Sequence, residues 1–304
     1  MKNMDTSKMM DRENHPCFNF SARNKFGRVH LPVAPKCNIQ CNFCNRKYSC
    51  VNESRPGVTS AVLSPFQASV YFDMLMERLS NISVMGIAGP GDAFANSEET
   101  LETICRIREK YPSMLFCLAT NGLNILPYFD KLIEFGLTHL TITVSAVKKE
   151  IGAKIYAWVF DGGRMYYGEE AAELLIGRQL EAVKAFSRGG VVVKVNFILL
   201  PGVNEKHVEE VAAKVSEAGA SIFNCMPVCP VEGTPFANIK EPEIAEVLKI
   251  RKKCSKYIKQ MTHCQRCRAD AVGMLKEGNS EEIRGLLSMA AALSVDSVTQ
   301  KCLL

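Results

Sequence analysis

The chain has 304 residues, 47% of them hydrophobic, and a formal net charge of +5 at pH 7. It is long and apolar enough to bury one large core, whereas a weak positive charge spread along the chain argues against a nucleic-acid partner. No apolar run reaches the roughly 18–20 residues of a membrane span, and residues 1–14 are too polar for a signal peptide, so we expect a soluble, cytoplasmic protein without a membrane partner.

The chain is rich in cysteine, with thirteen residues. Disulfides are rare in a reducing compartment, so metal ligation is the leading explanation for most of them. Three of them, Cys37, Cys41 and Cys44, stand close together, and the other ten are more than packing alone predicts.

A polar arm, residues 1–20, opens the chain and contains Cys17 beside Pro16. This cysteine either packs in the core or acts as a ligand together with residues from elsewhere. The arm leads to a first predicted strand, residues 28–33, on which His30 points away from the face that carries Val29 and Leu31. Both a structural role and a role in a site remain open for His30.

The loop after this strand carries Cys37, Cys41 and Cys44 at CxxxCxxC spacing. A [4Fe-4S] cluster normally takes four thiolates, so three closely spaced ones leave one iron open to a non-protein ligand. Zinc usually takes four ligands in CxxC-type pairs, which this spacing fits poorly. The spacing resembles the signature of the radical S-adenosylmethionine (SAM) superfamily, in which the open iron binds SAM.

The segment that follows, residues 45–57, is polar and ends in Pro-Gly. It carries Cys50, Glu53 and Arg55, which are the side chains of a site rather than of a core. Ser64 and Pro65 then have the N-cap and N1 chemistry that begins a helix, predicted over residues 65–79.

Strands and helices alternate from there to about residue 259. Further strands are predicted over residues 83–88, 114–119, 139–144, 191–199 and 221–226, and helices over residues 98–110, 126–135, 169–187, 205–218 and 241–259. Six strands that alternate with helices indicate a parallel sheet. Six units are too few for a closed eight-stranded barrel, so the expected fold is α/β, a partial (β/α)6 TIM-type barrel.

Polar residues recur where these strands end, which is where barrels of this kind place their chemistry. The second strand ends in Gly89-Pro90-Gly91-Asp92, a turn that resembles the SAM-binding GGE element of radical SAM enzymes. The other polar positions follow or lie on the third, fourth and fifth strands: Cys117, Asn121, Thr143, Ser145, Lys194 and Asn196. A ribose hydroxyl is one partner that such buried polar groups would suit.

Three other stretches do not follow the alternation. Residues 151–168 combine aromatic residues with Gly162 and Gly163, and form either a surface insertion or a lid. Cys264 and Cys267 form a CxxC, a strong metal-ligand spacing that is incomplete by itself. Cys225 and Cys229 are a second candidate pair, whereas Cys105, Cys254 and Cys302 are assigned to packing or surface; residues from 277 onward are expected to be a helical or partly disordered tail.

The resemblance becomes more specific when these segments are taken together. His15-Pro16-Cys17, residues 29–48, residues 50–58, the Gly89–Asp92 turn and the late CxxC are similar to the NifB family of radical SAM maturases, over residues 15–275. This resemblance implies an enzyme with two auxiliary [4Fe-4S] clusters as substrates. It fuses them and inserts a carbide derived from a SAM methyl group, which gives the eight-iron precursor of the nitrogenase cofactor.

The resemblance also implies residue roles. Cys37, Cys41 and Cys44 would hold the cluster that binds SAM. Cys17, Cys50 and Cys117 would bind one auxiliary cluster, with His30 as a possible exchangeable ligand, and Cys264 and Cys267 would bind the other. Catalytic roles are expected for His30, Glu53 and Arg55, and SAM contacts for Phe43, Gly89, Gly91, Asp92, Asn121, Thr143, Ser145 and Asn196.

The domain scheme that follows has an arm over residues 1–27, the barrel over residues 28–260 and a C-terminal extension over residues 261–304. The chain resembles the short form of the family without a carrier domain, so the expected partners are iron–sulfur cluster donors and a cofactor carrier or scaffold of nitrogenase assembly. Two alternatives stay open. One is a different radical SAM maturase that acts on a peptide or small molecule, and the other is an iron–sulfur scaffold that does not cleave SAM.

Overall fold

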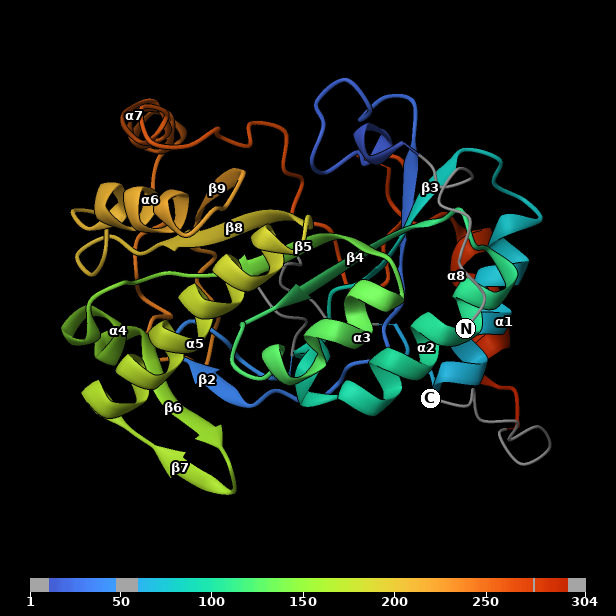
Figure 1. Cartoon of the computed structure of the whole chain (residues 1–304), viewed down its shortest axis with the longest axis horizontal. Helices are drawn as coiled ribbons and strands as arrows, with labels where there is room; N and C mark the ends of the chain where they lie inside the picture. Colours follow the sequence, from blue (N-terminus) through green and yellow to red (C-terminus); the bar gives the residue numbers. More distant parts are fainter. Residues whose placement is uncertain (1–10, 48–59, 276, 295–304) are drawn as a thin grey trace.

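The computed structural model describes residues 11–47, 60–275 and 277–294 (Figure 1). Its main sheet contains six parallel strands in the order β1 (Gly27–His30), β3 (Ile82–Ile87), β4 (Leu115–Thr120), β5 (Leu137–Thr143), β8 (Val192–Leu199) and β9 (Ile222–Pro227). A short strand, β10 (Val272–Gly273), pairs antiparallel with β1 at one edge. The prediction of a partial (β/α)6 barrel is confirmed.

Helices follow the strands as the alternation predicts. They are α1 (Pro65–Met76), α2 (Ser97–Lys110), α3 (Phe129–Glu134), α4 (Lys149–Ile155), α5 (Gly168–Arg188), α6 (Val208–Glu217), α7 (Ile244–Cys254) and α8 (Glu281–Ala291). The predicted helix over residues 126–135 is split, because Leu126–Tyr128 forms a 3-10 turn before α3. The helix predicted over residues 241–259 is shorter, since α7 covers only Ile244–Cys254. α4 lies between β5 and α5, where no helix is predicted.

The core lies between the sheet and its outer helices. Val193, Val195 and Phe197 on β8 are fully buried and belong to the same apolar cluster as Val183 and Phe186 of α5. β-Branched and aromatic residues suit a strand that is covered on both faces, so this run forms a central strand rather than an edge.

The first turn of α1 is fixed by a capping box. Ser64 accepts a hydrogen bond from the Gln67 amide at 3.2 Å, and the Gln67 side chain accepts one from the Ser64 amide at 2.9 Å. Gln67 also donates to the carbonyls of Ala291, the last residue of α8, and of Leu293, so it joins the first helix to the last. The predicted helical tail is therefore confirmed up to Ala291.

We expect Ser64→Ala to lower the free energy of unfolding by about 1 kcal/mol, because it removes one partner of a buried helix start. Chemical denaturation of the apoprotein measures this. A Ser80→Ala variant, which changes an exposed serine beyond the end of α1, is the control. Equal stability of Ser64→Ala and the parent would contradict the capping role.

A second, three-stranded sheet supports the cysteine loop. β2 (Ile39–Cys41), part of that loop, pairs antiparallel with β6 (Tyr156–Asp161), which pairs with β7 (Arg164–Tyr166). Gly162 and Gly163 have φ of +57° and +79°, as a tight hairpin turn between β6 and β7 requires. Phe160 is 44% exposed. The stretch at residues 151–168 is thus a brace for the loop, not a lid with its aromatic residues over a site.

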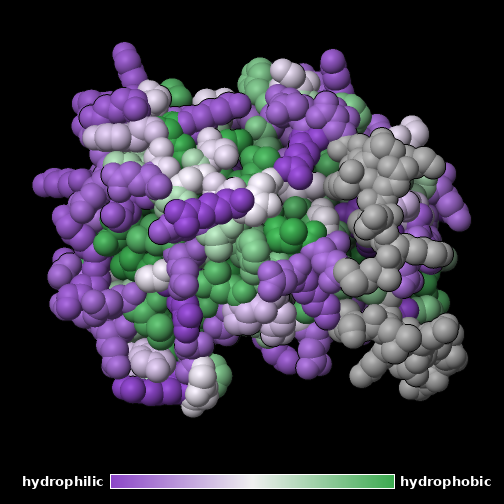
Figure 2. Space-filling model, viewed as in Figure 1, coloured by the Kyte–Doolittle hydropathy of each residue, from purple (hydrophilic) through white to green (hydrophobic). Residues whose placement is uncertain are grey.

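The arm and the C-terminal segment meet on the inner side of the half-barrel. The His263 ring nitrogen Nε2 donates to the Pro16 carbonyl at 3.0 Å, and Phe18 packs with Met261 and with Ile222 of β9. In the described part of the chain, no helix is both long and apolar enough to span a bilayer. Hydrophilic and apolar side chains are interspersed over the face shown in Figure 2.

Candidate active site

Two cavities lie side by side on the inner face of the half-barrel, and Ala119 lines both. The outer cavity has an empty volume of about 410 Å³ and contains all three thiols of the CxxxCxxC loop. Its other lining residues are Ile39, Arg46, Gly91, Asp92, Thr120, Asn121 and Thr143. It therefore lies at the carboxyl ends of β3, β4 and β5, where the sequence predicts the chemistry.

Side-chain amides hold the backbone of the cysteine loop in place. The Gln40 side chain donates to the carbonyls of Cys41 and Cys44, at 2.9 and 2.6 Å, and the Asn42 side chain donates to the Lys154 carbonyl at 2.9 Å. Burial is the main cause that raises the pKa of Cys37 to about 11 and the pKa of Cys44 above its usual value. Without metal these groups are neutral thiols, and metal binding must displace their protons.

The Gly89–Asp92 turn is built into the loop from the other side. The Gly91 amide donates to the Ala34 carbonyl at 2.6 Å, and the Asp92 amide donates to the Lys36 carbonyl at 2.8 Å. A Cβ on Gly91 would lie 2.1 Å from the Lys36 carbonyl oxygen, so only glycine allows this approach. The donor set therefore fits an iron–sulfur cluster, because three soft thiols share one cavity and the turn packs directly beneath them.

Asp92 lines the outer cavity, but its carboxylate is hydrogen-bonded to other residues of the protein. Its carboxylate accepts hydrogen bonds from the amides of Phe94 and Asn121 and from the Thr120 hydroxyl, at 2.6–3.1 Å. Burial raises its pKa, and these donors oppose that rise. Asn121 in turn donates to the Asn38 side chain at 2.7 Å. Asp92 thus joins the ends of β3 and β4 beneath the cysteine loop, while its predicted SAM contact stays a prediction.

We expect Gly91→Ala to displace the cysteine loop, since the added methyl group meets backbone and not a movable side chain. Overpacking of this kind costs about 1–3 kcal/mol of stability. The apoprotein should unfold at lower denaturant concentration, and the reconstituted protein should show weaker SAM binding by isothermal titration. Gly177→Ala, whose added methyl group would meet nothing within 4 Å, is the matched control. Unchanged SAM affinity in Gly91→Ala would contradict the argument.

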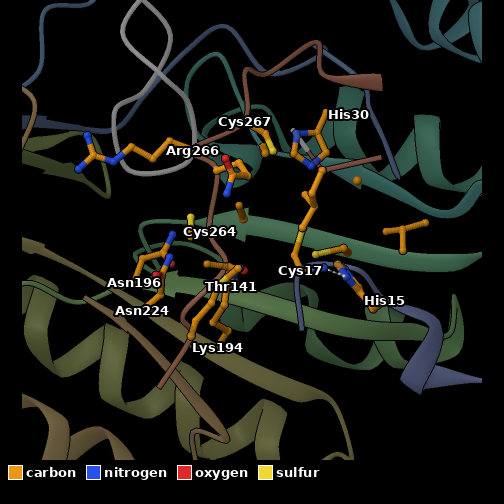
Figure 3. A pocket seen from close by; sticks show the side chains of 18 of the residues that line it. His15, Cys17, His30, Thr141, Lys194, Asn196, Asn224, Cys264, Arg266 and Cys267 are labelled. Carbon is orange, nitrogen blue, oxygen red and sulfur yellow. Dashed lines mark hydrogen bonds between the residues drawn. The ribbon is translucent and has the colours of Figure 1, made fainter. Parts of the chain in front are cut away.

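The inner cavity lies deeper in the half-barrel, with an empty volume of about 580 Å³ (Figure 3). Three parts of the chain that are far apart in sequence meet there: the arm, the inner faces of the strands, and the segment with the late CxxC. Its polar and sulfur-bearing residues are His15, Cys17, His30, Cys117, Thr141, Lys194, Asn196, Asn224, Met226, Met261, Cys264, Gln265, Arg266 and Cys267. The structure thus brings together the thiols that the sequence predicts as auxiliary ligands, Cys50 excepted.

His30 presents a lone pair to this cavity. Its Nδ1 lies 3.1 Å from the Arg268 carbonyl, which only accepts, so Nδ1 carries the proton and Nε2 has the free pair. Burial, with a contribution from the Arg28 charge, lowers the pKa of His30 to about 4. Gly86 makes room for the ring, because a Cβ there would lie 3.0 Å from His30 Cδ2. This geometry is that of a neutral nitrogen ligand and supports the predicted metal role.

The thiols of the inner cavity have different surroundings. Burial is the main cause that raises the pKa of Cys17 to about 12, and Cys267 adds to it. The buried guanidinium of Arg28 donates to Cys267 Sγ at 2.9 Å and to the Gly273 and Met274 carbonyls. Arg28 was not among the predicted site residues. In the strand pattern it looks like an ordinary surface-facing charge, and only its place beside β10 buries it.

Several predicted residues lie elsewhere. Phe43, Gly89 and Ser145 line neither cavity. Phe43 is 1% exposed within an apolar cluster, and the Ser145 hydroxyl accepts a hydrogen bond from the Ile198 amide. Asn196 lines the inner cavity, not the outer one, and accepts from Asn224 at 3.0 Å. Cys50, Glu53 and Arg55 lie outside the described residues.

The remaining described cysteines line neither cavity. Cys225 is buried in the core, and Cys229 accepts a hydrogen bond from Arg266 at 3.2 Å. Ten described cysteines are free thiols, whereas Cys105 on α2 is disulfide-bonded. Within the described ranges, no three His, Cys, Asp or Glu side chains converge closely enough to hold a single metal ion.

The chain is similar in sequence to known proteins. Residues 31–215 match the model of the radical SAM superfamily. The chain is 54% identical over 281 residues to FeMo cofactor biosynthesis protein NifB of Chlorobaculum tepidum, which covers 92% of this chain and 66% of that protein. It is 43% identical over 265 residues to NifB of Methanocaldococcus infernus, which covers 86% of each chain.

The fold also has solved counterparts. Methylornithine synthase (PylB) superposes with a TM-score of 0.52 at 15% identity, over 91% of this chain and 84% of that one. At this identity the likeness concerns the fold alone. The chain spans less than two thirds of the length of several other bacterial proteins with the NifB name.

Proposed function

The chain belongs to the NifB family of the radical SAM superfamily, and from this premise we propose that it builds the eight-iron precursor of the nitrogenase cofactor, NifB-co. In this proposal it fuses two [4Fe-4S] clusters and inserts a carbide that derives from a SAM methyl group. The observation that carries the proposal is the pair of adjoining cavities. One is lined by three cysteines, and the other by four cysteines and two histidines.

The outer cavity would hold the resident cluster through Cys37, Cys41 and Cys44. SAM bound at that cluster would supply its methyl group to a substrate sulfide and leave as S-adenosylhomocysteine. A second SAM, given one electron by the reduced cluster, would supply methionine and a 5′-deoxyadenosyl radical that removes hydrogen from the methyl. The protein's part is to position these groups. Asn121 and Thr143 line the wall on which SAM would lie, and Gly91 keeps the backbone close to the loop.

The inner cavity would hold the substrate clusters. Cys17, Cys117 and His30 would bind one of them together with Cys50, which lies outside the described residues, and Cys264 and Cys267 would bind the other. All five described residues line one cavity. Soft thiolates and a neutral imidazole suit iron–sulfur clusters, and an incomplete set of protein ligands allows a product to leave.

The surroundings of this cavity also suit an anionic substrate. Arg28 is buried with its guanidinium on Cys267, and the ammonium group of Lys194 lies 4.6 Å from the centre of the Phe18 ring. In a medium of low dielectric constant, these cations would stabilise the negative charge of thiolate-bound clusters. For Glu53 and Arg55 we propose proton handling during removal of hydrogen from the methyl group.

Isotope labelling tests the proposal. The protein is reconstituted anaerobically, reduced and given SAM labelled in its methyl group. We expect label in a protein-bound iron–sulfur product, together with S-adenosylhomocysteine and 5′-deoxyadenosine. Deoxyadenosine alone, with the methyl left on methionine, would favour a radical SAM enzyme with another substrate. A loaded protein that does not turn over SAM would instead be a scaffold.

The proposal extends to partners and place. The substrate clusters must be delivered and the product removed, so we propose iron–sulfur cluster donors and a cofactor carrier or scaffold of nitrogenase assembly as partners. Iron–sulfur chemistry needs a reducing compartment, which for this protein would be the cytoplasm. Pull-down of the loaded protein with purified donor and carrier proteins tests the first point.

A further inference from the structure

The inner cavity contains a second histidine, His15, which the proposed function does not use. It lies on the arm beside Cys17, is 2% exposed and lines the same cavity (Figure 3). Its ring also packs against His139 of β5, with ring centroids 4.3 Å apart, and against Phe18 at 4.5 Å. The ring is therefore held in one orientation by its neighbours.

The hydrogen bonds of His15 fix where its proton lies. The backbone amide of Cys17 donates to His15 Nδ1 at 3.1 Å, so Nδ1 supplies a lone pair and carries no proton. An imidazole keeps at least one ring proton, so a ring without a proton on Nδ1 is neutral. The single ring proton is then on Nε2.

Among the residues that the structure describes, Nε2 has no hydrogen-bond partner. A buried N–H without an acceptor costs about 1–3 kcal/mol, and folded proteins rarely leave one unsatisfied. An acceptor supplied by a ligand in the cavity would remove that cost.

The two histidines of this cavity, His15 and His30, therefore have opposite tautomers. His30 donates a hydrogen bond from Nδ1 to the Arg268 carbonyl and offers a lone pair at Nε2. His15 accepts at Nδ1 and offers an N–H at Nε2. A lone pair binds iron, whereas an N–H binds an anionic or lone-pair acceptor. In a cavity lined by thiols, the acceptor that an iron–sulfur ligand would bring is sulfur.

We propose that His15 donates a hydrogen bond from Nε2 to a sulfur atom of the iron–sulfur substrate bound beside Cys17. The inference rests on the proposed function, because it needs a cluster in the inner cavity. His15 is then a positioning residue. Hydrogen bonds to cluster sulfurs raise the reduction potential of the cluster, so His15 also sets how readily the substrate accepts electrons.

The test uses the full chain with Cys37, Cys41 and Cys44 replaced by alanine, so that only clusters in the inner cavity contribute. The protein is labelled with ¹⁵N-histidine and reconstituted. Pulsed electron paramagnetic resonance then reports histidine nitrogens near the cluster, and a redox titration gives its midpoint potential. We expect a strong nitrogen coupling from His30 as a ligand and a weak one from His15 as a hydrogen-bond donor.

In this background, His15→Leu should lose only the weak coupling and shift the midpoint potential to a more negative value. His15→Gln, which keeps an N–H near the same place, should restore part of that shift. His207→Leu is the matched control, since it removes a buried histidine ring that lines neither cavity. It should leave both couplings and the potential as they are.

Each other outcome overturns the inference. An unchanged potential and an unchanged weak coupling in His15→Leu would show that His15 touches no cluster sulfur. Loss of the strong coupling instead would make His15 a ligand. If the unsubstituted background binds no cluster at all, the proposed function fails as well. If His15→Leu binds no iron, two other measurements decide. The inference is overturned if the background protein shows no weak nitrogen coupling, or if the midpoint potential of His15→Gln equals that of the background protein.

Discussion

Replacing Cys37, Cys41 and Cys44 together with alanine should abolish SAM cleavage and leave iron–sulfur binding in the inner cavity. The three thiols line the outer cavity, whereas Cys17, Cys117, Cys264 and Cys267 line the inner one. Loss of one [4Fe-4S] cluster corresponds to about four iron atoms per chain. Iron analysis after anaerobic reconstitution and chromatographic detection of 5′-deoxyadenosine measure the two effects.

The control for this experiment is Cys254→Ala, which removes a buried thiol on α7 that lines neither cavity. It should keep both the iron content and SAM cleavage. If the triple variant lost all of its iron, the two cavities would not bind clusters independently. If it still cleaved SAM, the outer cavity would not be the site of that reaction.

Acidification from pH 6.5 to pH 4.5 should destabilise the apoprotein, and His139 should account for part of the effect. Burial is the main cause that lowers the pKa of His139 to about 3. The unfolded chain takes up a proton at this histidine near pH 6.5, while the folded protein does not, so stability falls as the pH falls through this window. The loss is about 1.4 kcal/mol per pH unit for one such group. Denaturation curves at several pH values measure it.

His139→Leu should reduce the slope of the unfolding free energy against pH by the contribution of one proton, about 1.4 kcal/mol per pH unit. Asp and Glu side chains that titrate toward the lower end of this window are the same in His139→Leu and in the parent, so the difference between the two slopes reports His139. Ser64→Ala is a suitable control, because it lowers stability at every pH without changing the slope. An unchanged slope in His139→Leu would mean that His139 titrates in the same way in both states.

The alternation of strands and helices was readable because each element carries its own local signal. Val191–Leu199 is β-branched and continuous, and Ser64-Pro65 is a helix start, so residue types alone place both elements. The predicted bounds differ from the observed ones by a few residues in most cases, since helix ends depend on capping contacts that periodicity does not encode. The β6–β7 hairpin was missed, because its partner is β2, more than a hundred residues earlier in the chain.

The cysteine loop could also be recognised from sequence, because a cluster site with local ligands has a fixed spacing. The inner cavity could not. Cys17, Cys117 and Cys264 become neighbours only when the arm and the C-terminal segment cross the inner face of the sheet. For the same reason Asn196 was placed with SAM and Ser145 in a site, although strand register puts one in the inner cavity and the other in the core.

The sequence by itself determined the barrel and the three thiols of the outer cavity, because these depend on residue types at short spacing. The candidate ligands of the inner cavity came from the resemblance to a known family. Only the tertiary structure decided which ligands share a cavity and which nitrogen each histidine presents. Those properties depend on contacts between segments far apart in the chain: His30 on the Arg268 carbonyl, and His15 held against His139. A hydrogen bond at one ring nitrogen decides whether the other nitrogen carries a proton or a lone pair.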